Sequence, residues 1–279
     1  MSYSFQTNVT SLVAEQNLRV NADFQSKTIT QLTSGYRINN SGDDPAGLAV
    51  ANKLRSSVAE LTQGVGNAND GIAILQTVDG GLNNIGNILD RLKTLATQSA
   101  SGTFSGDRAT TNNEFQTLLG EIDRQASNIG LASGGGTGGQ YNVSLSVYIG
   151  GGSTQANAQV TVDLSGSGNV VDSGGLGIST SAVDTQTNAL AAVTAIDTAL
   201  TNLGAVSGRV GAGENDLQYA INLAQSQITN QSAAESQIRD ADIATAAANL
   251  TKAQVLQQSS VAALAQANSS PQALLKLLQ

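Results

Sequence analysis

Residues 54–96 decide the fold, and they read LRSSVAELTQGVGNANDGIAILQTVDGGLNNIGNILDRLKTLA. Apolar residues occupy ten of thirteen positions that alternate in steps of four and three: Leu54, Val58, Leu61, Val65, Ala68, Ile72, Leu75, Asp79, Leu82, Gly86, Leu89, Lys93 and Ala96. A second row runs beside the first through Ile74, Val78, Gly81, Ile85, Ile88, Leu92 and Leu95. A sustained period of about 3.5 residues is typical of coiled-coil-like packing. We predict one long helix covered by more than one partner.

The C-terminal half contains a matching series. Ten of its eleven positions are apolar: Ala189, Ala192, Ile196, Ala199, Leu203, Val206, Val210, Gly213, Leu217, Ala220 and Ala224. A shorter helix is predicted over residues 112–128, with Phe115, Leu118, Ile122 and Ala126 on one face. The chain therefore reads as mainly α, a long coiled-coil-like bundle of three or four helices built from both chain ends.

Between these helical arms the composition changes. Residues 130–177 hold 14 of the 30 glycines, with turns or a linker expected at 134–139. Two runs alternate apolar residues with others: Tyr141, Val143, Leu145, Val147 and Ile149, then Val160, Val162 and Leu164. Such alternation predicts strands, and Gly150 to Gly152 separate the runs. We predict a small central β-hairpin.

Both chain ends carry narrow apolar stripes interrupted by polar residues. Residues 243–279 contain only two charged side chains, Lys252 and Lys276. Isolated helices of this kind are marginal in water, so we expect the ends to be largely disordered until they are buried against copies of the chain. The residues expected to drive this assembly are Leu18, Ala22, Ile29, Leu32, Ile243, Leu250, Leu264 and Leu274.

The charge and the missing residue types exclude several classes of protein. A net charge of −8 disfavours binding to nucleic acid phosphates. The chain has no His and no Cys, which removes the commonest general base and any thiolate metal site. No apolar run of about 18 residues is present, and residues 1–20 do not resemble a secretory signal peptide. We expect no membrane insertion, no cofactor and no enzyme activity.

Three local motifs have structural interpretations that we favour over chemical ones. Asp43 and Asp44 precede Pro45, which predicts a helix N-cap followed by Pro in the first helical turn. The glycine tracts lack the Gly-Lys-Ser/Thr of a phosphate-binding loop. Asp240 and Asp242 lack the surrounding pattern of a calcium loop, so we interpret them as helix-face charges, with Glu235 and Arg239 paired nearby.

Four segments resemble the signature motifs of bacterial flagellins. They are residues 32–52 (LTSGYRINNSGDDPAGLAVAN), 69–77 (NDGIAILQT), 238–242 (IRDAD) and 264–278 (LAQANSSPQALLKLL). Together the likeness covers roughly residues 1–130 and 183–279. In the middle the Asn-Gly turn common in the family is replaced by Asn128-Ile-Gly-Leu-Ala, which leaves the entry to the hairpin uncertain.

The resemblance implies a secreted, extracellular structural subunit that polymerises into the flagellar filament for swimming motility. It implies a coaxial terminal domain from residues 1–42 and 236–279, and a helical bundle from 43–132 and 180–235 that includes the insert 133–179. The short middle predicts no separate outer domain. Implied partners are further copies of the chain, a secretion chaperone, cap and hook-associated proteins, and the flagellar type III export apparatus.

The resemblance also raises one incidental interaction and one alternative function. Arg91, Leu95, Gln98 and Glu114 match positions through which an animal innate immune receptor recognises certain flagellins. The competing interpretation is that Leu95 is packed in a helix seam and that the charged residues face solvent. The alternative function is a hook–filament junction protein of the same superfamily. A metallopeptidase insert requires His, and the low aromatic content disfavours carbohydrate binding.

Overall fold

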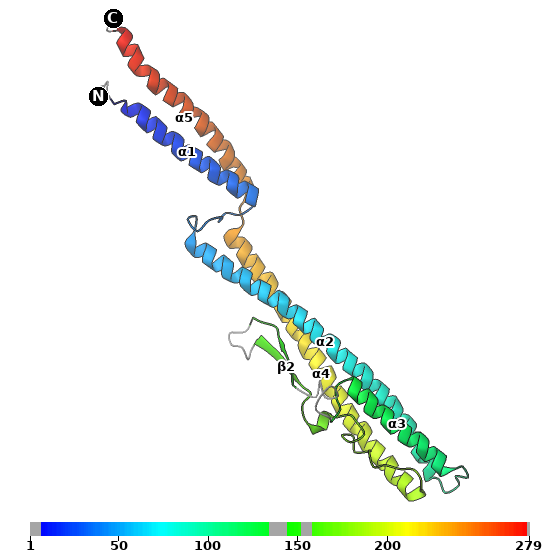
Figure 1. Cartoon of the computed structure of the whole chain (residues 1–279). Helices are drawn as coiled ribbons and strands as arrows, with labels where there is room; N and C mark the ends of the chain where they lie inside the picture. The colour runs from blue at the N-terminus through cyan, green and yellow to red at the C-terminus, as the bar shows by residue number, and fades with distance from the viewer. Residues whose placement is uncertain (1–6, 134–143, 152–157, 278–279) are drawn as a thin grey trace. The chain divides into compact units, whose positions relative to one another are not determined.

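The computed structural model describes residues 7–133, 144–151 and 158–277, and for 167 and 270–277 it describes the backbone only. Within that part the helices are α1 (Val9–Ser34), α2 (Pro45–Ala100), α3 (Arg108–Asn128), α4 (Gln186–Arg239) and α5 (Ile243–Leu277), with a short 3-10 helix at Ser167–Asn169 (Figure 1). The predicted mainly α fold is confirmed. The chain divides into two compact units, residues 57–229 and residues 1–56 with 230–279. The predicted boundaries, at residues 42 and 236, lie closer to the α1–α2 and α4–α5 loops than the observed boundaries do.

The unit of residues 57–229 is built around one long seam on α2. Its buried positions alternate in steps of three and four: Leu61, Gly64, Ala68, Gly71, Leu75, Val78, Leu82, Ile85, Leu89, Leu92, Ala96 and Ser99. Val65, Ile72 and Asp79 of the first predicted series lie only half-buried beside this seam, whereas Val78, Ile85 and Leu92 of the second predicted row belong to it. The seam also contains Gly64 and Gly71, which a count of apolar side chains did not include.

Helices α3 and α4 complete this core. On α4 ten of the eleven predicted positions are buried, and Ile221 takes the place expected for Ala220. On α3 the buried residues are Phe115, Leu119, Ile122 and Ala126, so Leu119 replaces Leu118. One window of α4 is long and apolar enough to cross a membrane by length and composition alone. The buried row of α4 belongs to the core shared with α2 and α3, a setting in which soluble helices meet the same test.

The predicted hairpin is an antiparallel pair, β1 (Ser144–Tyr148) and β2 (Gln159–Asp163), in which Val147 is opposite Val160. It packs on glycines of two helices. The carbonyl of Ile149 occupies the space where Gly64 of α2 would carry a Cβ, and Val162 does the same at Gly213 of α4. The hairpin approaches the backbone of α2 and α4 this closely only because Gly64 and Gly213 lack a side chain. The expected strand residues Tyr141 and Val143, the linker 134–139 and Gly152 lie outside the described residues.

The departure from the Asn-Gly pattern is resolved at the end of α3. Gly130 adopts a left-handed conformation with φ of 70°, and the amide of Leu131 donates to the carbonyl of Ala126 at 2.9 Å. This is the helix C-terminal bond pattern that glycine favours. Beyond it, Asp172 accepts a hydrogen bond from the amide of Ser133 at 2.7 Å, and Asp123 accepts one from the amide of Ser173 at 2.7 Å. These bonds attach the following loop to the bundle.

Candidate assembly surface

Helices α1 and α5 pack along each other (Figure 1), and the residues at their contact are mostly small or polar. The α1 row that turns from solvent is Ser11, Ala14, Leu18, Asn21, Gln25, Thr28 and Leu32. The α5 row is Ala246, Leu250, Ala253, Gln257, Ser260, Leu264 and Ala267. Among the described side chains of these two helices, Thr28, Ala246 and Ala253 alone are fully buried. The pair therefore has little apolar core of its own.

Large apolar side chains on the same helices are exposed instead. We call them the outer apolar residues: Val9, Leu12, Val13, Val20 and Ile29 on α1, with Ile243, Val255, Leu256 and Val261 on α5. Val9 leaves 62% of its surface exposed, and Leu12 and Val13 leave 55%. Val13 and Leu256 line an open groove of about 410 Å³ whose lining contains no charged residue. Large apolar side chains exposed around an open groove make this part of the pair a candidate interaction site.

The eight residues expected to drive assembly fall into separate groups. Four are half-buried in the rows at the α1–α5 contact: Leu18, Leu32, Leu250 and Leu264. Three are exposed: Ala22, Ile29 and Ile243. Leu274 lies in α5, but its side chain is outside the described residues. Sequence reasoning missed most of the outer apolar residues, although Val9, Val13 and Val20 form a second row at helical spacing that could have revealed them.

The loop after α1 is tied to the connection between α4 and α5, and we call this region the joint (residues 35–44 with 238–242). The amide of Arg37 donates to the carbonyl of Arg239 at 2.6 Å, and the amide of Ala241 donates to Gly35 at 2.8 Å. These bonds flank an antiparallel bridge between Tyr36 and Asp240. The guanidinium of Arg239 stacks on the Tyr36 ring, 4.1 Å from its centre. Backbone pairing at the joint thereby connects the segment that follows α1 to the segment that links α4 and α5.

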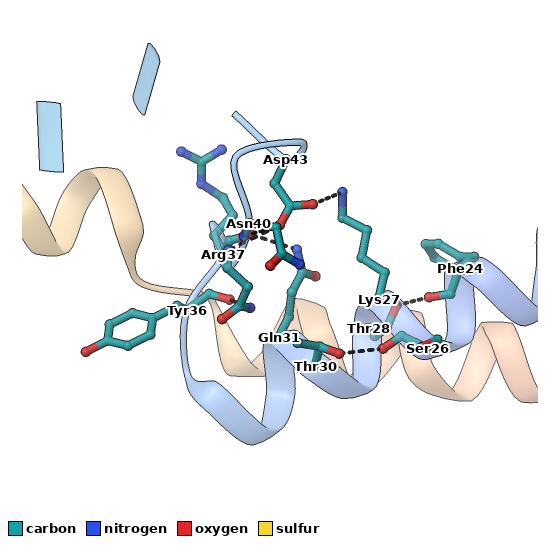
Figure 2. A network of polar contacts seen from close by, with 11 residues as sticks. Phe24, Ser26, Lys27, Thr28, Thr30, Gln31, Tyr36, Arg37, Asn40 and Asp43 are labelled. Atoms are coloured by element: carbon teal, nitrogen blue, oxygen red, sulfur yellow. Dashed lines mark hydrogen bonds and ion pairs between the residues drawn. The ribbon is translucent and has the colours of Figure 1, made fainter. Parts of the chain in front are cut away.

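One side of the joint is held to α1 by a polar network, which Figure 2 shows from close by. Lys27 of α1 pairs with Asp43 at 2.8 Å. The other carboxylate oxygen of Asp43 accepts the amides of Asn39 and Asn40, both at 3.1 Å. The hydrogen bond from Lys27 and those from the two amides lower the pKa of Asp43, because they stabilise its charged form. Gln31 adds a hydrogen bond to the carbonyl of Arg37 at 3.0 Å.

Asp44 and Asp242 lie at helix starts, and Asp240 lies between α4 and α5, so the expectation that Asp240 and Asp242 are helix-face charges was wrong. Asp44 accepts the amide of Gly47 at 2.9 Å, and α2 begins at Pro45. Asp242 accepts the hydroxyl of Thr245 at 2.7 Å and the amide of Ala244 at 2.9 Å at the start of α5, and these hydrogen bonds, that from the Thr245 hydroxyl first, lower the pKa of Asp242. Glu235 and Arg239 approach to 3.7 Å. These carboxylates are engaged in capping and ion pairing.

The net charge is divided unequally between the two units. Residues 1–56 and 230–279 contain eight Lys and Arg and seven Asp and Glu, a net charge of +1. Residues 57–229 contain five Lys and Arg and fourteen Asp and Glu, a net charge of −9. The two values add to the −8 of the whole chain. The unit that carries the outer apolar residues is nearly neutral, so copies of it can approach with little repulsion.

The four residues of the immune-receptor hypothesis lie in the other unit. Arg91 of α2 and Glu114 of α3 form an ion pair at 2.6 Å, and Gln98 is exposed. Leu95 is only 3% exposed and belongs to the hydrophobic core. Arg91, Gln98 and Glu114 therefore lie at the surface, whereas the Leu95 side chain packs inside.

Comparison with known proteins finds similarity to bacterial flagellins along most of the chain. Residues 5–130 match the bacterial flagellin N-terminal helical region, and residues 193–278 match the bacterial flagellin C-terminal helical region. The chain is 34% identical to a flagellin of Halalkalibacterium halodurans, over 98% of both chains. It is 33% identical to the flagellar filament 30.7 kDa core protein of Treponema maltophilum, over 97% of this chain and 98% of that protein. The crystal structure of Bacillus cereus flagellin is similar with a TM-score of 0.48 at 26% identity, covering 61% of this chain and 94% of that one.

Proposed function

Because the chain belongs to the bacterial flagellin family, we propose that this flagellar filament subunit polymerises by packing its outer apolar residues against neighbouring copies. The observation that carries the proposal is the reversed placement of polarity on α1 and α5. Asn21, Gln25 and Ser260 lie at the contact between the two helices, while Leu12, Val13 and other large apolar residues face outward.

Burial of these side chains supplies the driving force for assembly. Removing apolar surface from water is favourable by about 25 cal/mol per Å². The near-neutral charge of the terminal unit and the uncharged groove between Val13 and Leu256 add little electrostatic opposition. Contacts between different faces of successive copies do not close on themselves, so they extend into a helical filament.

The proposal is tested on α1 with a matched pair of variants. Leu12→Ser combined with Val20→Ser removes two outer apolar side chains, whereas Gln16→Ser changes an exposed polar residue between them. We expect the double variant to raise the critical concentration for filament formation by about tenfold or more, because apolar burial is lost. Gln16→Ser should leave it near the parent value. Sedimentation and negative-stain electron microscopy measure the outcome; equal critical concentrations for all three proteins would reject the proposed surface.

The remaining partners follow from the same family membership. We propose that the chain is exported through the flagellar type III apparatus, held beforehand by a secretion chaperone on α5, and assembled beneath a cap next to hook-associated proteins. A chaperone that binds the full chain and fails to bind a chain lacking residues 243–279 would support this. The filament role is favoured over the hook–filament junction by the filament core protein among the relatives. Failure to elongate from added filament fragments would favour the junction role.

We further propose a structural role without catalysis, because the candidate carboxylates Asp43, Asp44 and Asp242 are used in capping and ion pairing. Recognition by the animal innate immune receptor is a second proposal, supported by the surface position of Arg91 beside Glu114. Receptor-expressing reporter cells should respond to monomer and lose response with Arg91→Ala. A full response from Arg91→Ala combined with Glu114→Ala would remove these residues from the contact.

A further inference from the structure

The alanine positions of α5 discriminate poorly between alternative alignments of α1 and α5. Helix α5 carries Ala on several faces, with Ala246 and Ala253 buried while Ala247 and Ala263 are exposed. A shift of α5 by one heptad replaces Ala246 with Ala253, leaving the same small side chain at the contact. A slip also exchanges Leu250 for Gln257 at the contact, and backbone pairing at the joint aligns the end of α1 with the start of α5. Interactions farther along the pair are needed to hold the same alignment away from the joint.

Three side-chain hydrogen bonds cross the α1–α5 contact. Asn8 donates from Nδ2 to the carbonyl of Ala267 at 2.9 Å, and Ser11 donates from Oγ to Oδ1 of Asn268 at 2.8 Å. Asn21 donates from Nδ2 to Oγ of Ser260 at 2.7 Å. By contrast, the buried hydroxyl of Thr28 donates within its own helix to Phe24. The three crossing bonds all require the same alignment of the two helices.

We propose that Asn21 and Ser260 hold the register of α1 against α5 away from the joint. Both side chains are half-buried in the contact rows, where water is partly excluded. A slip of seven residues places Asn21 opposite Ala253 or Ala267, neither of which has a side chain that accepts a hydrogen bond. Leaving a half-buried amide without its partner costs free energy, and a buried Asn selects register in coiled coils by the same effect.

The register matters for the proposed function, on which this part of the inference rests. In the observed alignment Val13 and Leu256 line one groove. A slip of one heptad exchanges Leu256 for Asn249 or Ala263, and the groove loses its largest apolar side chain on α5. Asn21 and Ser260 are therefore positioning residues that arrange the outer apolar residues without belonging to them.

The absence of native cysteine allows the register to be read by cross-linking. One reporter carries Ser11→Cys and Asn268→Cys, which joins the observed register. A second carries Ser11→Cys and Val261→Cys, which joins a register shifted by one heptad. Both are treated with a short bismaleimide and quantified by mass spectrometry, in filaments that contain an excess of unmodified chain. Dilution restricts cross-links to single subunits and supports variants that assemble poorly alone.

We expect the observed-register link to dominate, and Asn21→Leu to raise the ratio of shifted to observed links about tenfold. Gln16→Leu, an equal change at an exposed site of the same helix, should leave the ratio unchanged. The Ser11 bond is lost in every reporter, so the comparison isolates Asn21. An unchanged ratio in Asn21→Leu, or no preference in the parent, overturns the proposal. Unchanged filament formation by the Leu12→Ser and Val20→Ser variant, with the observed register still dominant in the parent, would count against the assembly surface and not against the register.

Discussion

The bundle of residues 57–229 and the terminal helix pair place their apolar residues in opposite ways. In the bundle, Leu75, Leu82 and Leu89 of α2 are at most 1% exposed and contribute to a core shared by three helices and the hairpin. In the pair, the contact rows mix Asn21, Gln25 and Ser260 with four half-buried leucines, and the nine outer apolar residues face outward.

The difference indicates which region is complete within a single chain. The bundle buries its large apolar residues in its own core. Its unit carries the net charge of −9, which favours solubility. The terminal pair buries few side chains, and its unit is nearly neutral. Its outer apolar residues are therefore exposed in the single chain and can pack against neighbouring copies. Stability of the monomer and stability of the filament should therefore depend on different residues, and each prediction below tests that separation.

The largest effect on monomer stability is expected from a core truncation in the bundle. Leu82→Ala removes a side chain that is 1% exposed and should lower the free energy of unfolding by about 3 kcal/mol. Leu12→Ala, the same change at a site 55% exposed in the terminal pair, should change it by less than about 0.5 kcal/mol. Urea denaturation of both monomers measures the contrast. Similar losses in both variants would remove the distinction between the two regions.

A smaller effect is expected where the hairpin packs on α2. Gly64→Ala places a methyl group against the carbonyl of Ile149 and should destabilise the bundle by about 1–3 kcal/mol. Gly80→Ala, on the same helix with open space around it, should stabilise the bundle by about 0.5–1 kcal/mol through helix propensity. Thermal unfolding of the two variants reports the opposite signs. Stabilisation by Gly64→Ala would show that the hairpin does not pack there.

The smallest effect is expected in acid at the joint. The folded pKa of Asp43 lies below its unfolded value, so its contribution to stability is present above the unfolded pKa of about 3.9 and is lost as the pH falls through the folded pKa. Amide exchange at Asn39 and Asn40, corrected for intrinsic rates, should accelerate over that range. Asp43→Asn should show faster exchange already at neutral pH and no such acid dependence. An acid dependence that persists in Asp43→Asn would assign it to another group.

Much of the bundle was predictable because its period is long and its apolar residues are large. Leu61, Leu75 and Leu89 lie in the seam where the heptad count placed them. Val78, Ile85 and Leu92 lie in the same seam and were expected from the second row. Gly64 and Gly71 were missed because they are buried under the hairpin, and sequence periodicity does not anticipate close backbone packing. Gly130 likewise ends α3 by a left-handed turn that the expected Asn-Gly motif did not reveal.

The terminal pair was harder to interpret, for a physical reason. Periodicity identifies rows on a helix but does not say which row meets which partner. The predicted stripe containing Leu18, Leu250 and Leu264 lies at the contact between α1 and α5, whereas Val13 and Val255 point outward. The crossing bond from Asn21 to Ser260 joins residues 239 positions apart, a distance over which local patterns carry no information.

Hydrogen exchange of monomer and filament, compared segment by segment, tests the central claim most directly. We predict that amides of residues 9–34 and 243–269 exchange rapidly in a verified monomer and become strongly protected in the filament. Amides of residues 75–96 and 192–217 should be strongly protected in both states, because their core is complete within one chain. Equal protection of the terminal segments in both states would contradict the claim that neighbouring copies complete the terminal pair.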